Sequence, residues 1–394
     1  MGVVQSGKQA VRQFTAKVTA RSTALVMLAA LCACGRPEGA LLPVTEPTVV
    51  GAKVDMLAAT TRAPSDQPGV VFNGERGEGL SFANVVVSIP PDRPVGSVQW
   101  PRQGPGDPAR EFAVTSLTAL SRAAVLPWFK EHVKAKRRVL IFVHGFNTRF
   151  DAAVFRFAQF VHDTDASWVP VLFSWPSRGQ ITDYVYDRES TNFSRTDLAY
   201  VLRETARSPY VDEVVVLAHS MGAWLTVESL RQIALQDGRI PKKISNIVLA
   251  SPDLDLDVFR RQVVEMGPDR PQITIFVSRN DRALGLSALL AGNVTRVGAV
   301  DLTREPYKSE LEAARGVTVL DLSALQGGDA LNHSQFATSP EMVQLIASRM
   351  AGGQTISDSQ STGADTVQAV GTAVGTLATA PITILTGGMR SIAP

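Results

Sequence analysis

A serine at position 220 stands where an apolar stretch gives way to a helical pattern. It lies in Ala218-His219-Ser220-Met221-Gly222, directly after the strand-like residues 213–217. A tight turn between a buried strand and a helix lifts a serine hydroxyl above the sheet and aims backbone N–H groups at the atom under attack. The segment therefore predicts a nucleophile elbow, with Ala218 standing where the usual Gly-x-Ser-x-Gly pattern has its first glycine.

A serine nucleophile needs a general base, and the base needs an acid that fixes its tautomer. The chain has five histidines, and His333 alone follows the last predicted strand in a loop. Its position favours it as the base. His132 and His162 fall in predicted helices and are better explained as surface or packing residues, and His144 as bracing its turn. His219 is next to Ser220, but neighbouring side chains in a sharp turn point apart.

Two aspartates compete for the role of the acid. Asp281 and Asp253 each follow a predicted strand. We prefer Asp281, because the order strand, acid, helix, strand, histidine then places acid and base on adjacent loops. Asp253 stays as the alternative acid, and either aspartate could instead cap the helix that follows it.

The oxyanion donors are sought at a second turn after a strand. The segment His144-Gly145-Phe146-Asn147 follows the predicted strand at 139–143. A glycine turn between strand and helix exposes backbone N–H groups to a developing oxyanion. We assign the N–H groups of Phe146 and Met221 to this oxyanion hole. Helix capping near Asn147 would be compatible with that role.

These residues need a sheet that gathers the ends of several strands. From Arg138 the chain alternates apolar strands with helices, which predicts a mostly parallel sheet covered on both faces, with ligands at the carboxyl ends of the strands. Earlier strand candidates predict antiparallel strands at the N-terminal side; they lie at 54–59, 80–89 and 98–100. We expect an irregular stretch at 176–195 before the helix at 196–207.

Composition restricts the chemistry further. The chain has 394 residues and a formal net charge of +2, which gives no case for nucleic acid as a partner. Its two cysteines, Cys32 and Cys34, both lie near the N-terminus, so the body is expected to have no thiolate nucleophile, disulfide or cysteine metal site. The sequence has no H-E-x-x-H motif. We expect neither a metal nor an organic cofactor.

The N-terminal residues are typical of an export signal. Four basic residues and no acidic one precede a short apolar run at 24–31, and Leu31-Cys32-Ala33-Cys34 resembles the bacterial lipobox. The resemblance implies a lipoprotein signal peptide at 1–33, lipidation of Cys34, and a lipid anchor in the bacterial cell envelope, on the periplasmic side of the outer membrane. An ordinary secretory signal is the alternative. Residues 34–52 are then a Pro-rich tether.

Four segments together identify a family resemblance. They are Val143–Asn147, Ala218–Gly222, Ala58–Arg62 and Phe173–Pro176. With them, the chain resembles serine hydrolases of the α/β-hydrolase fold, esterase- or lipase-like, and a little-characterised bacterial family among them. The resemblance implies a hydrolase domain at 53–351, a Ser-His-Asp triad without a cofactor, and a small-molecule or lipid-like ester as substrate.

The surroundings of the triad are expected to select the substrate. The stretch 176–195 carries three aromatic residues and 284–298 is the second candidate; packing on the sheet explains the aromatic residues equally well. The three are Tyr184, Tyr186 and Phe193. Residues 352–394 are rich in Gly, Ala and Thr and predict a flexible tail rather than a membrane-associated helix.

Two other functions stay open at this point. The same triad would serve a peptidase or amidase, because ester and amide cleavage share its chemistry. A non-catalytic envelope lipoprotein on a hydrolase scaffold would be expected to lack one member of the triad, whereas all three are present in order. The sequence predicts no oligomeric state.

Overall fold

The computed structural model describes most of the body of the chain. The described residues are 39–45, 51–133, 137–165, 168–301, 304–307, 309, 316–325, 331–351, 365–367 and 382–386. The predicted signal peptide, Cys34 and most of the predicted tether lie outside them. All described residues belong to one compact unit, Gly39–Pro394. Among them, no helix combines the length and the apolar character needed to cross a bilayer.

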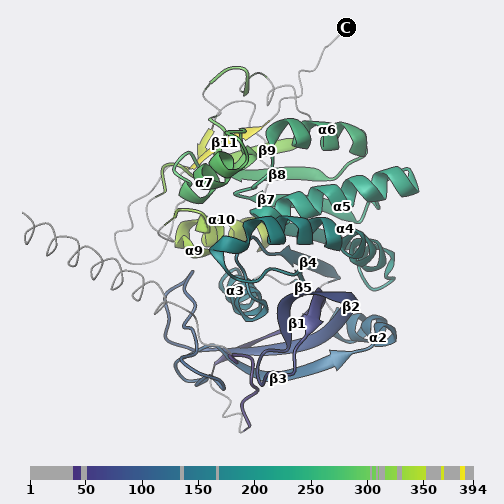
Figure 1. Ribbon diagram of the computed structural model, residues 1–394, viewed down its shortest axis with the longest axis vertical. Helices are drawn as coiled ribbons and strands as arrows, with labels where there is room; N and C mark the ends of the chain where they lie inside the picture. The colour runs from purple at the N-terminus through teal and green to yellow at the C-terminus, as the bar shows by residue number, and fades with distance from the viewer. Residues whose placement is uncertain are drawn as a thin grey trace, which may run out of the picture. The chain divides into compact units, whose positions relative to one another are not determined.

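One twisted sheet runs through the described residues (Figure 1). Its order is β10-β11-β9-β8-β7-β6-β4-β5-β1-β2-β3, and the neighbours from β9 through to β1 pair in parallel. The strands are β1 (Ala52–Pro64), β2 (Phe72–Ile89), β3 (Ala113–Leu120), β4 (Arg138–Val143), β5 (Val169–Ser174), β6 (Glu213–His219), β7 (Ile244–Ala250), β8 (Gln272–Val277), β9 (Val317–Asp321), β10 (Asp365–Val367) and β11 (Ile382–Thr386). The predicted α/β architecture with antiparallel strands at the N-terminal edge is confirmed.

Helices cover both faces of this sheet. One face packs against α2, α4, α5 and α6, and the other against α3, α9 and α10. The helices are α2 (Arg122–His132), α3 (Phe150–Asp163), α4 (Tyr184–Arg207), α5 (Met221–Asp237), α6 (Leu256–Met266), α7 (Arg282–Leu290), α9 (Gln335–Thr338) and α10 (Pro340–Ala351), with short 3-10 turns η1 (Ile181–Asp183) and η2 (Val297–Ala299).

Strand β6 shows why the central strands read as continuous apolar runs. Val214, Val216 and Ala218 face the core under α4 and α5, whereas Val215 and Leu217 face the core under α3. Successive side chains of a strand point to opposite faces, so a strand covered on both faces needs apolar residues throughout.

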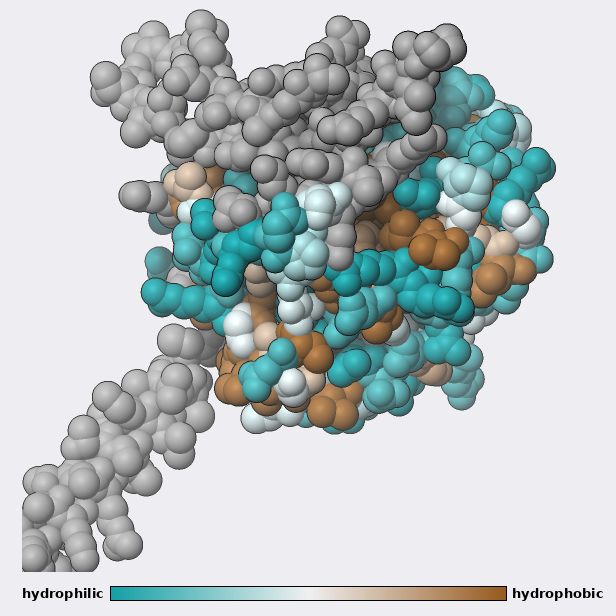
Figure 2. Space-filling model, turned by 90° about the horizontal axis from the view of Figure 1, so that it is seen from above, coloured by the Kyte–Doolittle hydropathy of each residue, from teal (hydrophilic) through white to brown (hydrophobic). Residues whose placement is uncertain are grey.

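The surface outside this core is mixed in character. Figure 2 shows groups of apolar residues lying among hydrophilic ones on the described part of the face seen from above. Three exposed leucines of α7 are notable among the large exposed apolar side chains: Leu286, Leu289 and Leu290, each at least half exposed. They lie on the face of α7 opposite its buried residues Leu284 and Ser287.

Three segments differ from the sequence-based expectation. Residues 98–100 are not a strand; the third antiparallel strand is β3 instead. The stretch 176–195 is irregular only at its start, because α4 already begins at Tyr184. Within the segment predicted as a flexible tail, β10 and β11 pair with each other and β11 pairs antiparallel with β9.

Candidate active site

Ser220 sits on a sharp turn between β6 and α5. Its backbone has φ 53° and ψ −122°, a conformation that non-glycine residues rarely adopt and that costs strain. Hydrogen bonds fix the turn: the Ser220 N–H donates to the Ala250 carbonyl at 2.9 Å, and the Asp253 N–H donates to the Ser220 carbonyl at 3.2 Å. The strand β7 and the loop after it therefore hold the elbow in place.

Two glycines allow the elbow to approach its neighbouring loop. A Cβ on Gly222 would lie 2.3 Å from the His144 carbonyl oxygen, and one on Gly145 would lie 2.8 Å from Ser220 Cβ. Both distances are shorter than real carbon contacts, so neither position accepts a side chain without movement. Ala218, in contrast, is fully buried in β6 without disturbing the fold. The last glycine of the motif is thus required here, and the first is not.

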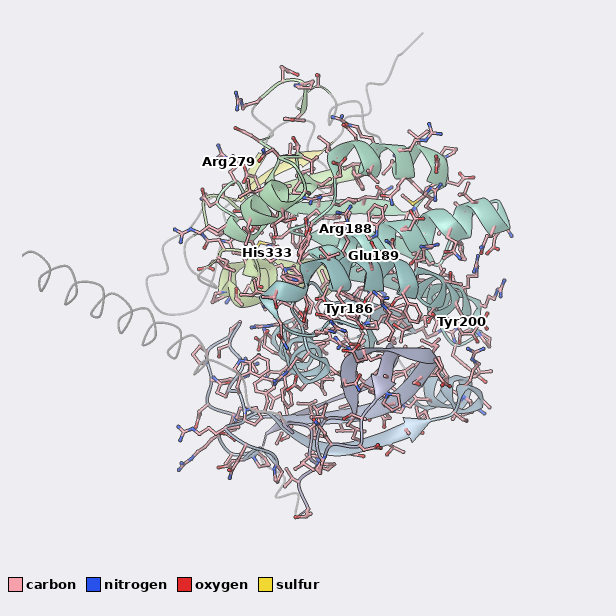
Figure 3. The ribbon with its side chains drawn as sticks, viewed as in Figure 1. Tyr186, Arg188, Glu189, Tyr200, Arg279 and His333 are labelled. Carbon is pink, nitrogen blue, oxygen red and sulfur yellow. The ribbon has the colours of Figure 1, made fainter. Side chains whose placement is uncertain are left out.

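The structure brings together Asp281 and His333, the residues predicted as acid and base. The carboxylate Oδ2 lies 2.7 Å from His333 Nδ1, and the Asp281 side chain is fully buried. Its other oxygen, Oδ1, accepts the Leu284 N–H at 3.0 Å and caps α7. Capping and binding the histidine are therefore simultaneous duties of one carboxylate. In Figure 3 His333 is labelled beside α9, below Arg279, which follows β8.

A second histidine supports the loop that carries His333. His219 Nε2 lies 3.0 Å from the His333 carbonyl oxygen, and the two rings are 4.7 Å apart. Burial lowers the pKa of His219 well below its usual value, and the nearby His333 contributes to this shift. A neutral His219 then donates its Nε2–H to that carbonyl. The residue next to Ser220 thus supports the loop that carries His333.

Asp253 is engaged elsewhere. It pairs with Arg296, whose Nε lies 3.1 Å from Asp253 Oδ1, and both side chains are almost completely buried. Its carboxylate also accepts hydrogen bonds from Ser287 Oγ at 2.5 Å and from the Tyr184 hydroxyl at 3.1 Å. The structure therefore brings Asp281, not Asp253, to His333.

The loop after β4 faces the elbow. Phe146 belongs to this loop and is half-buried, with the Tyr184 ring packed edge-on at 5.3 Å. Met221 opens α5, where the first N–H groups of a helix have no partner within the helix. The structure thus places one predicted donor residue in the loop that faces Ser220 and the other next to it in the chain.

The three aromatic residues predicted near the substrate have different surroundings in the structure. Tyr184 contacts the loop of Phe146, and burial raises the pKa of its hydroxyl. Tyr186 is stacked between two guanidinium groups, Arg178 at 3.7 Å and Arg76 at 4.6 Å. Phe193 is 43% exposed on α4. Of the three, Tyr184 alone touches a residue of the candidate site, and it also joins α4 to α7 through Ser287 at 2.9 Å.

Three site residues escaped the reasoning from motifs. Arg62 at the end of β1, Trp175 after β5 and Asp187 in α4 all surround the loop of Phe146. Arg62 and Trp175 lie in segments that resemble the family, although the pattern assigned them no role. Within the described residues, no cluster of three or more His, Cys, Asp or Glu side chains could hold a metal ion.

Comparisons with known proteins agree with this architecture. No curated protein sequence matches the chain significantly. Solved structures similar to it include a hydrolase from Agrobacterium vitis S4 (TM-score 0.35, 11% identity, covering 71% of this chain and 95% of that one). A second is a lipase-esterase related protein from Clostridium acetobutylicum ATCC 824 (TM-score 0.31, 12% identity, covering 56% of this chain and 95% of that one). A third is an α/β-superfamily hydrolase from Xanthomonas campestris pv. campestris (TM-score 0.27, 17% identity, covering 54% of this chain and 98% of that one). A family match spans residues 121–349, more than half of the chain, and so the chain belongs to the alpha/beta hydrolases of unknown function (DUF900).

Proposed function

We propose that the chain is a serine hydrolase that cleaves an ester-like bond, a carboxylic ester or a thioester, through Ser220, His333 and Asp281. One observation carries the proposal: the 2.7 Å contact between Asp281 Oδ2 and His333 Nδ1. It lies beside a strained serine turn, since the His333 carbonyl rests on His219, the neighbour of Ser220. Acyl transfer requires a serine on such a turn together with an acid and a base, all at the same edge of the sheet.

The steps follow from this arrangement. With Nδ1 of His333 directed at Asp281, Nε2 is the nitrogen that takes the hydroxyl proton of Ser220. Ser220 Oγ attacks the carbonyl carbon, and the tetrahedral intermediate collapses to an acyl-enzyme while the proton passes to the leaving group. A water molecule then attacks the acyl-enzyme while His333 takes its proton, and the carboxylic acid product leaves as Ser220 regains the proton. Asp281 keeps the imidazole oriented and stabilises its charged form.

The N–H groups of Phe146 and Met221 stabilise the negative oxygen in both halves of the reaction. Met221 adds the favourable field of the α5 N-terminus. Losing one such donor typically lowers kcat by about two to three powers of ten.

The test is labelling of the full chain by a fluorophosphonate probe, which reacts with activated serines. We expect the wild type to be labelled and to hydrolyse p-nitrophenyl butyrate, and Ser220→Ala to lose both properties. Ser229→Ala is a matched control, because Ser229 is fully buried in α5 and binds main-chain carbonyls. A wild type that resists a probe which labels a control esterase would refute the proposal. Cleavage of the matching anilide at a comparable rate would instead favour the amidase.

For location, we propose a lipid anchor on Cys34 at the periplasmic side of the outer membrane. The support is the basic leader and the lipobox-like Leu31-Cys32-Ala33-Cys34. Cys34→Ser is then expected to move the protein from the membrane to the soluble fraction. Unchanged membrane fractionation would count against the anchor.

A further inference from the structure

The guanidinium of Arg62 is completely enclosed at the end of β1. Arg62 is only 1% exposed, and all five of its N–H donors have partners. The partners are Ser174 Oγ at 2.8 Å, the carbonyls of Asn73 at 3.1 Å, Ser177 at 2.8 Å and Thr148 at 2.6 Å, and His144 Nε2 at 3.3 Å. None of the five is a carboxylate, although removing a cation from water is costly without an opposite charge. Such an arrangement calls for a reason beyond packing.

Two of these contacts bracket Phe146. Arg62 Nη2 reaches His144, two residues before Phe146, and Thr148, two residues after it. One nitrogen therefore holds both ends of the turn that presents the Phe146 N–H.

His144 transmits this restraint to a single peptide group. Burial and the nearby Arg62 lower the pKa of His144 to about 3, so its ring is neutral. Its Nε2 accepts the Trp175 N–H at 3.2 Å, and its Nδ1–H donates to the Gly145 carbonyl at 2.9 Å. The C=O of Gly145 and the N–H of Phe146 belong to the same trans peptide plane and point in opposite directions. Holding the carbonyl against His144 therefore turns the Phe146 N–H away from that ring.

The far side of the turn is fixed by a buried carboxylate on α4. Asp187 accepts the Asn147 N–H at 3.2 Å and the Ser177 hydroxyl at 2.5 Å. Ser177 Oγ in turn accepts the Thr148 N–H at 3.0 Å. The charge of Asp187 also favours the protonated form of Arg62, whose pKa burial lowers to about 10. The turn is thus held from both sides by opposite charges that do not bind each other directly.

We propose that Arg62 is a positioning residue for the reaction: it orients the Phe146 N–H toward the oxyanion through His144 and Thr148. The proposal rests on the proposed function, in which Phe146 is an oxyanion donor. It also means that the site depends on a residue outside the family match, which begins at residue 121.

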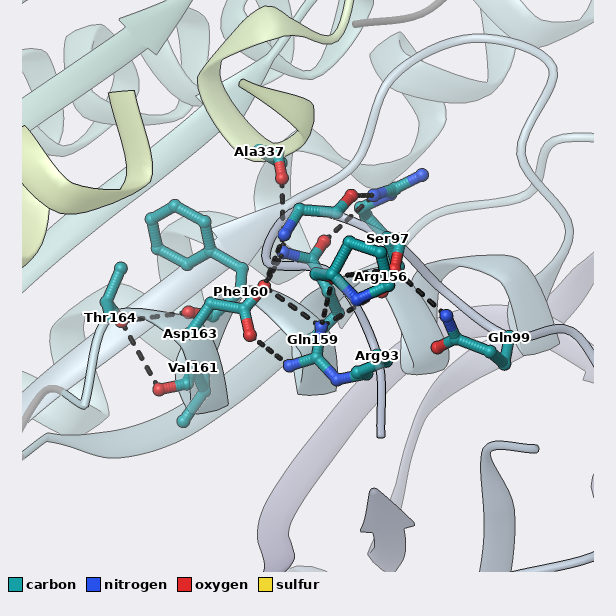
Figure 4. Close-up of polar contacts among 12 residues, drawn as sticks. Arg93, Ser97, Gln99, Arg156, Gln159, Phe160, Val161, Asp163, Thr164 and Ala337 are labelled. Atoms are coloured by element: carbon teal, nitrogen blue, oxygen red, sulfur yellow. Dashed lines mark hydrogen bonds and ion pairs between the residues drawn. The ribbon is translucent and has the colours of Figure 1, made fainter. Parts of the chain in front are cut away.

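The test compares Arg62→Met and Arg62→Lys with Arg93→Met in the full chain. Arg93 is the matched control, since its side chain is also almost completely buried, at 3% exposed, and it comes from the same N-terminal region. Figure 4 shows that it binds Asp163, while Gln159 bonds both Asp163 and the Ala337 carbonyl. Losing either arginine removes a buried charge, but only Arg62 touches that turn.

Two measurements separate positioning from general structure. The first is kcat and KM for p-nitrophenyl butyrate. The second is inhibition by a trifluoromethyl ketone, to which Ser220 Oγ adds: its proton passes to His333 and the ketone oxygen becomes an oxyanion. The corresponding methyl ketone, which adds far less readily, reports ground-state binding. An interaction made only with the oxyanion lowers kcat and leaves KM unchanged.

For Arg62→Met we expect kcat to fall about 10- to 100-fold with KM within about threefold, somewhat less than the loss of the whole donor. The inhibition constant of the trifluoromethyl ketone should rise by a similar factor and that of the methyl ketone should not. Arg93→Met should lower Tm without this split. Equal kinetic behaviour of the two variants at equal folded fraction would overturn the proposal.

Arg62→Lys keeps the charge and covers the case in which Arg62→Met does not fold. We expect faster amide hydrogen exchange in peptides that cover 144–149, unchanged exchange in those that cover 279–285, and a smaller fall in kcat. Unchanged exchange and kcat in this variant would also overturn the proposal. If the wild type neither hydrolyses the ester nor reacts with the fluorophosphonate, the proposed function fails as well; an active wild type with insensitive Arg62 variants defeats the positioning role alone.

Discussion

The two sides of the candidate site are built differently. On the oxyanion side, a buried polar network ties the turn of Phe146 to β1, to the loop after β5 and to α4. On the acid–base side, Asp281 and His333 meet across two loops, and the His333 side chain is 14% exposed. The helix that Asp281 caps, α7, carries the three exposed leucines. The oxyanion side is therefore held by many hydrogen bonds, whereas the acid–base pair is centred on one carboxylate and its histidine is partly exposed to solvent.

The contrast indicates which kind of substitution should affect each side of the site most. The Phe146 turn belongs to one connected buried network, so removing one of its hydrogen bonds or changing its shape also disturbs the others. The acid–base side relies on one carboxylate, so a single change of charge there removes a function outright.

The largest effect is expected at Asp281. Asp281→Asn keeps the shape but favours the wrong imidazole tautomer, and the corresponding change in a well-studied triad lowers kcat by about 10⁴. Asp253→Asn should reduce kcat less than tenfold. It leaves Arg296 without its buried partner, so it should cost about 3 kcal/mol of unfolding free energy. Ester hydrolysis and chemical denaturation of both variants measure this. A greater loss of kcat in Asp253→Asn would move the acid to the β7 loop.

An intermediate effect is expected on the oxyanion side. A methyl group on Gly145 would collide with Ser220 Cβ and with His219 Nδ1, 2.9 Å away. Gly145→Ala should therefore displace the turn and lower kcat by about 10²-fold, comparable to losing one donor. Gly79→Ala is the control, because a Cβ there meets nothing within 4 Å on β2. It should keep full activity and add about 0.5–1 kcal/mol of stability. Activity retained in Gly145→Ala would contradict the close approach of the loop to the elbow.

The smallest effect concerns pH and compares the two buried histidines. His144 on the oxyanion side and His219 on the acid–base side both have pKa values lowered by burial, His144 to about 3. The unfolded chain takes up protons near pH 6.5 that the folded state does not bind, so stability is highest above that pH and falls as pH is lowered, for His144 down to about pH 3.

Below pH 6 the unfolding free energy decreases as the pH is lowered. We expect each histidine to steepen this decrease by about 1.4 kcal/mol per pH unit. Denaturant titrations of His144→Asn and His219→Asn between pH 7 and pH 4.5 measure the change. Each variant should have a shallower slope than the wild type by about one proton. A slope that stays the same would mean that the replaced ring is charged in the folded state.

Much of the acid–base side was predictable from local patterns. Asp281 and His333 each follow an apolar strand, and the carboxyl ends of parallel strands meet at one edge of a sheet. The same logic located Ser220 and the Phe146 turn. Each inference needed only the strand and the few residues after it.

The supports of the oxyanion side were hidden for a different reason. Arg62 binds Ser174, which lies 112 positions away in the chain, and no local pattern encodes such a contact. The start of α4 was missed because its buried face is polar, so an apolar periodicity is absent there. That face carries Asp187, Ser190, Thr191 and Ser194, at helical spacing.

The position of Arg62 on β1 has a consequence for folding. β1 can pair early with β2, its neighbour in sequence, whereas its other partner β5 is about a hundred residues further along the chain. Contacts between distant segments form late, because their loop-closure entropy must be overcome first. Arg62 can thus pair with β2 before it reaches Ser174 and Thr148, its more distant partners. The proposed oxyanion hole is therefore completed only when β1 joins β5, after the β1–β2 hairpin has formed.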